Sequence, residues 1–199
     1  MRRDRRRRAG RPGHLRRHIA GGGTSDVPIT APYAGFAWTN TYVLDVPLYL
    51  SQVGASGYGN GLAQITSPNV GFTGFGNAAA FAAPVRFALI GMTLGAGWYD
   101  NLQVVVTGFR MGSAVHAATF TLSASAAPTA ASFGWSDIDR VEIAPVAGTG
   151  TPVGFPAGGG RQVYFDTIAV PEPASLALMC VGLAGLGLAR RRLAPRAVA

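Results

Sequence analysis

The stretch from Val27 to Ala169 alternates between apolar and polar residues in short runs, a pattern typical of β-strands rather than helices. The clearest run is Leu102–Phe109, which is rich in β-branched residues and lies between turn-forming residues. No convincing amphipathic helix and no internal repeat appears, and glycine-rich turns separate the runs. The pattern predicts a mainly β body folded as an antiparallel β-sandwich, with strands at 36–44, 85–89, 102–109, 116–122, 141–143 and 164–168.

A different pattern begins at Ala174, because the sixteen residues from there to Ala189 carry no charge. As a helix this run is about 24 Å long at ~1.5 Å per residue, against a bilayer core of roughly 30 Å. Local thinning of the bilayer and snorkelling of flanking arginines compensate for the difference, so we expect a single transmembrane helix at 174–189. Arg190, Arg191 and Arg192 follow directly and are expected to act as the membrane stop, which leaves the body outside the cytoplasm. A buried core helix and a plain tail anchor are the alternatives.

Charge is concentrated at the two ends of the chain. All 17 basic residues are arginines, and nine of them lie in residues 1–18. Residues 19–170 hold four arginines against seven acidic residues, a net charge of −3. The overall net charge of +8 therefore does not describe the body, and we expect no nucleic-acid partner for it.

Residues 1–26 form an arginine-rich segment that we expect to be disordered. A secretion signal continues from its charges into roughly 7–15 apolar residues, whereas here Ile19 and Ala20 run straight into three glycines. The favoured hypothesis is a wrong start site or reading frame, since a GC-rich gene read in the wrong frame yields this composition. A basic arm that binds nucleic acid or acidic lipid, and a solvated tail without a role, are the alternatives.

The residues Pro171, Glu172 and Pro173 stand directly before the apolar run. The order Pro-Glu-Pro, short apolar helix, arginine cluster and chain end resembles the PEP-CTERM sorting signal of Gram-negative bacteria. The same region is also labelled an ice-binding protein C-terminal domain, a name that implies nothing about ice. The resemblance implies that an exosortase, a transpeptidase-like membrane enzyme, recognises Pro171, Glu172 and Pro173 and cuts near them. It assigns 170–199 to the tag and leaves 27–169 as the β-sandwich body.

The body loosely resembles the jelly-roll, galactose-binding-like sandwiches that precede many such tags. The resemblance rests on Tyr33–Asn40, on Trp98–Leu102 before a valine-rich strand, on Asp137–Val141 and on Phe165–Ile168. It implies a jelly-roll-like connectivity of the sandwich. Such bodies usually begin with a strand rich in Phe and Asp, and the arginine segment stands in its place here, which agrees with a wrong start.

Aromatic residues in glycine-rich loops make a sugar-binding site one candidate in the body. Trp98 and Tyr99 precede Asp100 and Asn101, and Tyr58 lies in another glycine-rich loop. An aromatic ring complements the apolar face of a pyranose, and the Asn101 amide suits its hydroxyl groups. Trp98, Tyr99, Asn101 and Tyr58 are therefore the candidate glycan contacts, and burial of the tryptophans in the core is the competing interpretation.

Carboxylates supply the remaining candidates for chemistry. Asp100, Asp139 and Asp166 are candidate ligands of a structural calcium ion, and no other cofactor is expected. Asp137 and Asp139 are the candidates for a hydrolytic carboxylate pair, with a solvated loop-to-strand junction as the plainer interpretation. His116 is the one histidine of the body, which also lacks cysteine and lysine, so zinc and Schiff-base chemistry are not expected there.

Together these features predict a non-enzymatic protein of the cell envelope or extracellular matrix, exported and held by its tail. The expected partners are an exosortase and the cytoplasmic (inner) membrane, with exopolysaccharide as a further candidate. A carbohydrate-binding module for exopolysaccharide and a hydrolase that uses body carboxylates are the alternative functions.

Overall fold

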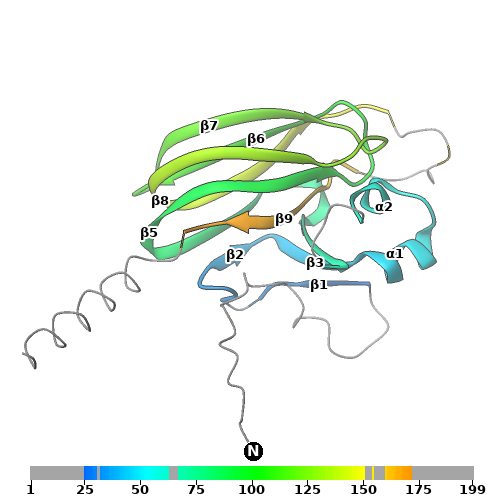
Figure 1. Ribbon diagram of the computed structural model, residues 1–199, viewed down its shortest axis with the longest axis horizontal. Coiled ribbons are helices and arrows are strands. Elements are labelled where there is room, and N and C mark those ends of the chain that lie inside the picture. The colour runs from blue at the N-terminus through cyan, green and yellow to red at the C-terminus, as the bar shows by residue number, and fades with distance from the viewer. Residues whose placement is uncertain (1–24, 31, 63–66, 151–153, 155–159, 172–199) are drawn as a thin grey trace, which may run out of the picture.

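Long antiparallel strands dominate the computed structural model, which describes residues 25–30, 32–62, 67–150, 154 and 160–171 (Figure 1). Two of them, β5 (Ala79–Ala96) and β8 (Thr129–Ala147), are 18 and 19 residues long and pair along most of their lengths. The other strands are β1 (Asp26–Pro28), β2 (Ala37–Thr39), β3 (Thr41–Asp45), β4 (Asn69–Thr73), β6 (Leu102–Arg110), β7 (Ser113–Leu122) and β9 (Val163–Ala169). The helices are α1 (Val46–Val53), α2 (Gly57–Gly61) and the 3-10 turn η1 (Gly74–Gly76).

The strands form one continuous hydrogen-bonded path in the order β1-β3-β4-β9-β5-β8-β6-β7. β2 lies outside this path and pairs with the first residues of β5, whereas β9 pairs with its last residues. All of these pairings are antiparallel. The mainly β, antiparallel class predicted from the sequence is therefore confirmed. Figure 1 shows β5 to β8 on one side of β9 and β1 to β3 on the other, with α1 and α2 together at one end of the strands.

Irregular pairing bends the ribbon of β5 and β8 near its middle. Register shifts occur between Ala82 and Phe87 and again before Gly91. Bulges of this kind increase the twist and curvature of a sheet. The hairpin of β6 and β7 packs back over the first half of β8, where the rings of Phe120 and Phe133 lie 5.7 Å apart. The bent sheet can therefore enclose a core with its own strands.

The main core lies between β5, β6, β8 and β9. Its largest fully buried side chains include Phe81, Leu94, Leu102, Ile138 and Phe165, each no more than 2% exposed. A smaller cluster joins β3, α1, α2 and β4 to the segment before β6 and to β9. Its buried members are Leu44, Val46, Tyr58, Val70, Trp98 and Tyr164. This second cluster positions the aromatic residues discussed below.

The strand expected at 36–44 is divided in two at Asn40. This residue has a left-handed backbone with φ of 47°, and its side-chain amide donates hydrogen bonds to the carbonyl oxygens of Gly74 and Ala78, each at 3.0 Å. Asparagine tolerates this conformation better than most residues. β2 therefore pairs with β5 while β3 pairs with β1 and β4, and the predicted single strand is wrong at this point.

Short helices accompany the strands, although no convincing amphipathic helix appears in the sequence. Asp45 caps α1 by accepting a hydrogen bond from the Leu48 backbone N–H at 3.0 Å, and Pro47 occupies the first turn, where a proline costs no helical hydrogen bond. The helix ends at Gly54, whose φ is 86°. Only eight residues long, α1 is too short for its periodicity to stand out from the alternating pattern.

No helix within the described ranges is long and apolar enough to cross a membrane. The span predicted at 174–189 and the arginines Arg190–Arg192 lie outside these ranges, as do the residues of the arginine-rich segment before Ser25.

Candidate functional site

The sorting motif begins where the folded body ends. β9 runs to Ala169 in the middle of the sheet, between β4 and β5. Val170 is half-buried and Pro171 is exposed. Glu172 and Pro173, the other two predicted recognition residues, lie outside the described residues. The motif is thus separated from the last strand by a single residue.

A second candidate site is an aromatic pocket of about 210 Å³ between β1, β3, β4, α1 and α2. Six of its lining side chains are aromatic, and its side-chain polar groups include one carboxylate and one amide. We call this set the aromatic pocket. Its lining residues are Asp26, Tyr42, Leu44, Tyr49, Tyr58, Phe72, Gly74, Phe75, Trp98 and Gln162.

Most neighbouring rings in the aromatic pocket meet edge to face, and the rings of Tyr42 and Phe72 are tilted at 39°. The ring of Tyr49 lies 5.5 Å from that of Tyr58 and 6.3 Å from that of Trp98, at interplanar angles of 82° and 75°. Across the pocket lining, the rings of Tyr42 and Phe75 are 5.8 Å apart at 84°. Edge-to-face geometry is favourable for aromatic pairs, and it points ring planes in several directions around the space.

The backbone of the aromatic pocket depends on residues that adopt unusual conformations or lack a side chain. Phe75 has φ of 55° although it is not a glycine, and its side chain is 79% exposed. At Gly74 a Cβ atom would come within 2.6 Å of the Tyr42 ring, and at Gly97 within 2.7 Å of the Tyr58 ring. The left-handed backbone at Phe75 is strained, and such strain often accompanies functional sites.

Among the residues that line the aromatic pocket, Asp26 is the one that carries a charge, and none is cationic. Burial raises the pKa of the Tyr58 hydroxyl well above its usual range, with further contributions from Tyr49, Tyr164 and Asp26. Burial also raises the pKa of Tyr49, against a hydrogen bond from Trp98 that lowers it. Both hydroxyl groups are therefore neutral at physiological pH, and the lining carries one negative charge.

The predicted glycan contacts are only partly brought together. Tyr58 and Trp98 both line the aromatic pocket, and they are 2% and 7% exposed, which for Trp98 agrees with the competing interpretation of burial in the core. Tyr99 is half-buried against both cores, and Asn101 is exposed in a turn with φ of 53°. Sequence reasoning missed Tyr42, Tyr49, Phe72, Phe75, Asp26 and Gln162, because they lie on elements that meet only in the fold.

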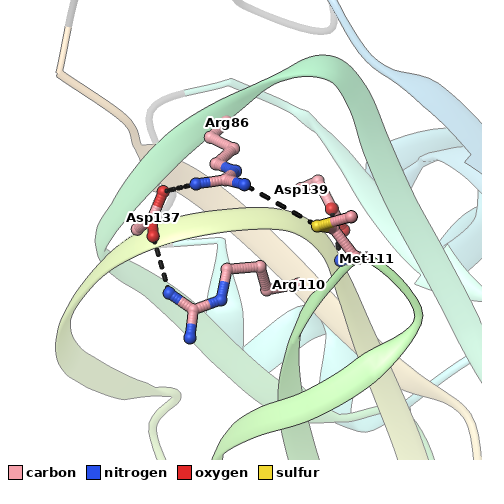
Figure 2. A network of polar contacts seen from close by, with 5 residues as sticks. All are labelled: Arg86, Arg110, Met111, Asp137 and Asp139. Carbon is pink, nitrogen blue, oxygen red and sulfur yellow. Dashed lines mark hydrogen bonds and ion pairs between the residues drawn. The ribbon is translucent and has the colours of Figure 1, made fainter.

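The predicted carboxylate pair belongs to a surface network at the end of the β6–β7 hairpin (Figure 2). Asp137 accepts hydrogen bonds from Arg86 at 2.8 Å and from Arg110 at 2.7 Å, and so forms an ion pair with each. Asp139 accepts the backbone N–H of Met111 at 2.7 Å. Figure 2 shows Asp137 between the two guanidinium groups, with Met111 and Asp139 beside them.

Ionisation of Asp137 is favoured by this network. The hydrogen bond from Arg110, followed by that from Arg86, holds the pKa of the Asp137 carboxyl below its usual range. A general acid must keep its proton near neutral pH, which calls for a raised pKa. The geometry therefore suits a structural tie between β5, β6 and β8 better than a hydrolytic pair.

The three candidate calcium ligands lie apart, each with partners of its own. Asp100 accepts hydrogen bonds from the Ser123 hydroxyl and from the Ser125 backbone N–H, the latter at 3.0 Å. Asp139 accepts from Met111, and Asp166 is buried within β9. Among residues 25–30, 32–62, 67–150, 154 and 160–171, no three His, Cys, Asp or Glu side chains are grouped so that they could hold a metal ion.

Comparison with known protein families identifies the tail of the chain. Residues 169–192 match the family model described as the PEP-CTERM protein-sorting motif. No curated protein and no solved structure matches the chain. The resemblance seen in the sequence of the tail is therefore confirmed, and it implies an exported, envelope-associated protein that an exosortase processes.

Proposed function

We propose that the chain is a non-enzymatic envelope or extracellular-matrix protein of a Gram-negative cell, delivered through its PEP-CTERM motif to an exosortase in the inner membrane. The observation that carries the proposal is the match of residues 169–192 to that motif. The apolar run 174–189 and the arginines after it supply a single membrane span with the body outside the cytoplasm. The body folds as a jelly-roll-like sandwich, which the bent sheet forms.

The position of the motif supports recognition without unfolding of the body. Pro171 is exposed and stands two residues after the end of β9. Both edges of β9 remain paired, with β4 on one side and β5 on the other. An enzyme that binds the motif therefore need not break the hydrogen bonds of the sheet.

A non-catalytic role for the body is supported by the arrangement of its carboxylates. Asp137 is engaged by two arginines that favour its ionised form, and Asp139 is engaged by a backbone N–H. The lowered pKa of Asp137 is the reverse of what the protonated partner in glycoside hydrolysis needs. The alternative of an exopolysaccharide-binding module is favoured by Tyr58 and Trp98 in one pocket, but burial leaves their rings little area for stacking on a pyranose.

The proposal is tested in a host with an intact exosortase and in the same host without it. The intact mass of the protein is measured in membrane and released fractions, for the natural chain and for a variant with Pro171, Glu172 and Pro173 changed to alanine. We expect C-terminal cleavage only with the natural motif and the enzyme together. Met111→Ala is the control, since this exposed side chain lies far from the motif in sequence and should leave processing unchanged. Identical C-termini in all four combinations of chain and host would contradict the proposal.

A further inference from the structure

The aromatic pocket has a property that sorting through the tail does not require. Its lining combines six aromatic side chains with one carboxylate and no cationic group. The described residues of the body include arginines at positions 86, 110, 140 and 161, yet none of these lines the pocket. Within the part of the chain that the structure describes, no arginine of the lining competes for the charge of Asp26.

The ring geometry favours a compact cation over a flat ligand. A sugar or a nucleobase stacks on an open, flat ring face. In the aromatic pocket, most neighbouring rings meet at 75° to 84°, and Tyr42 meets Phe72 at 39°, so that ring planes in several directions line one space. The negative faces of several rings around one space attract a positive charge, and this is the arrangement of aromatic cages for alkylated ammonium groups.

The aromatic pocket has a buried floor and a rim of more accessible rings. Tyr58 and Trp98 form the buried floor, whereas Tyr42 and Tyr49 are half-buried and Phe75 is 79% exposed. A ligand entering from solvent therefore meets Phe75, Tyr42 and Tyr49 before the floor. The left-handed backbone at Phe75 holds this large apolar ring at the pocket in spite of its exposure to water.

The size of the pocket limits the ligand further. At about 210 Å³ the space lies below the ~300 Å³ at which pockets for drug-sized ligands begin. An oligosaccharide is too large to enter it, whereas a single ammonium group with its alkyl substituents is of suitable size. Asp26 is exposed at the edge of the lining, so a ligand reaches its charge without burying an unpaired carboxylate.

From the rings, the charge and the size together, we infer that the aromatic pocket binds a small alkylated ammonium ion. The rings of Tyr42, Tyr49 and Phe75 surround the cationic group, and Asp26 supplies the opposite charge. This inference goes beyond the proposed function and does not depend on it, since a chain that no exosortase processes has the same pocket.

Calorimetric titration of the full-length chain tests the inference. The chain is kept in a non-ionic detergent with neither a sugar nor a choline head group. The ligands are choline chloride, its neutral isostere 3,3-dimethyl-1-butanol, and glucose, at constant ionic strength. We expect saturable binding of choline, with the neutral isostere weaker by about threefold to tenfold, as cation–π and charge contributions of this kind imply.

Two single substitutions locate the binding. Asp26→Asn removes the charge and keeps the shape, and Phe75→Ala removes one ring; each is expected to weaken choline binding by about threefold to tenfold. Asp139→Asn is the matched control for the charge, because Asp139 lies outside the pocket lining. Met111→Ala is the matched control for the ring, because Met111 is 80% exposed with φ of 51°, close to the values for Phe75.

Circular dichroism establishes first that each variant is folded, which substitutions outside the two hydrophobic clusters should permit. Equal affinity for choline and its neutral isostere would overturn the inference and identify a plain apolar pocket. Saturable binding of glucose without choline binding would overturn it in favour of a sugar site. Choline binding that both pocket substitutions leave unchanged would place the ligand elsewhere and would equally overturn it.

Discussion

The imidazole ring of His116 lies stacked on the indole ring of Trp135, with ring centroids 5.3 Å apart and planes 11° from parallel. His116 comes from β7 and Trp135 from the first half of β8, two segments that share no hydrogen-bonded register. Gly108 of β6 makes room for the contact, because a Cβ atom there would lie 3.0 Å from the Trp135 ring. The one histidine of the body is therefore a packing residue that holds the β6–β7 hairpin over β8.

Loss of this stack should lower the stability of the body. We expect His116→Ala to reduce the free energy of unfolding by about 1 kcal/mol, the usual value of an aromatic pair. His116→Phe, which keeps a planar ring, should recover most of the loss. Urea unfolding followed by circular dichroism measures both. Equal losses for the two variants would show that the ring contact is not what stabilises the hairpin.

The stability of the body should fall in acid partly through Asp137. Two arginines hold the pKa of the folded-state carboxyl below the unfolded value of about 3.9. A depressed folded-state pKa contributes stability that is present above the unfolded pKa and is lost as pH falls through the folded value. Unfolding between about pH 2 and 6 should therefore show less acid dependence for Asp137→Asn than for the natural chain.

The matched test of this pH effect removes the partners instead of the carboxylate. Arg110→Gln should move the loss of stability toward the unfolded pKa, and more so than Arg86→Gln, because the hydrogen bond from Arg110 is the larger cause of the shift. Both carboxylate and arginines are exposed, so the effect should shrink at high salt. An acid transition that none of these variants moves would contradict the account.

Alkaline pH should destabilise the smaller, second cluster through its buried tyrosines. Burial raises the pKa of Tyr164 to about 12 and that of Tyr58 well above its usual range. A raised folded-state pKa contributes stability that is present below the unfolded value of about 10 and is lost as pH rises through the folded value. We expect unfolding above about pH 10 together with tyrosinate absorbance, and less alkaline sensitivity in Tyr164→Phe.

Glycine is expected to be indispensable at position 95. A Cβ atom there would lie 2.1 Å from the ring of Tyr164, which is 1% exposed and cannot move aside freely. Gly95→Ala should therefore cost about 3 kcal/mol through overpacking. Gly59→Ala is the control, because its Cβ atom would meet only the flexible end of Leu50 at 3.3 Å, and alanine favours helix. Similar unfolding midpoints for the two variants would contradict the packing account.

Alternation along the chain was enough to predict the strands that carry the main core. The valines of 102–109 lie in β6, and the residues around 116–122 and 164–168 lie in β7 and β9. In β6 and β7 more buried and more exposed positions alternate, and β9 begins with four buried residues, so their sequences reflect the burial of each position. The sorting motif could also be predicted from the sequence, because Pro-Glu-Pro, the apolar run and the arginine cluster occur in a fixed order.

What the sequence did not reveal depends on contacts between distant residues. The break at Asn40 depends on carbonyl groups at residues 74 and 78, and the tie at Asp137 depends on arginines 27 and 51 residues away. The aromatic pocket draws its lining from residues between 26 and 162, with no local spacing that marks them as one site. Tyr58 and Trp98 are buried by the same long-range packing. Their glycine-rich surroundings in the sequence had suggested exposed rings instead.

The place of β9 in the sheet has a mechanical consequence. The tail leaves the body two residues after a strand that is hydrogen-bonded on both edges. β4 pairs with β9 at Tyr164 and Phe165, whereas β5 pairs with β9 between Val163 and Ala169. A pull on the tail along the strand axis therefore loads chiefly the ladder with β5 in shear, so that its bonds must fail together. An edge strand would instead be peeled away one bond at a time. Drag on the body is thus carried into the centre of its sheet, the part that best resists being drawn out.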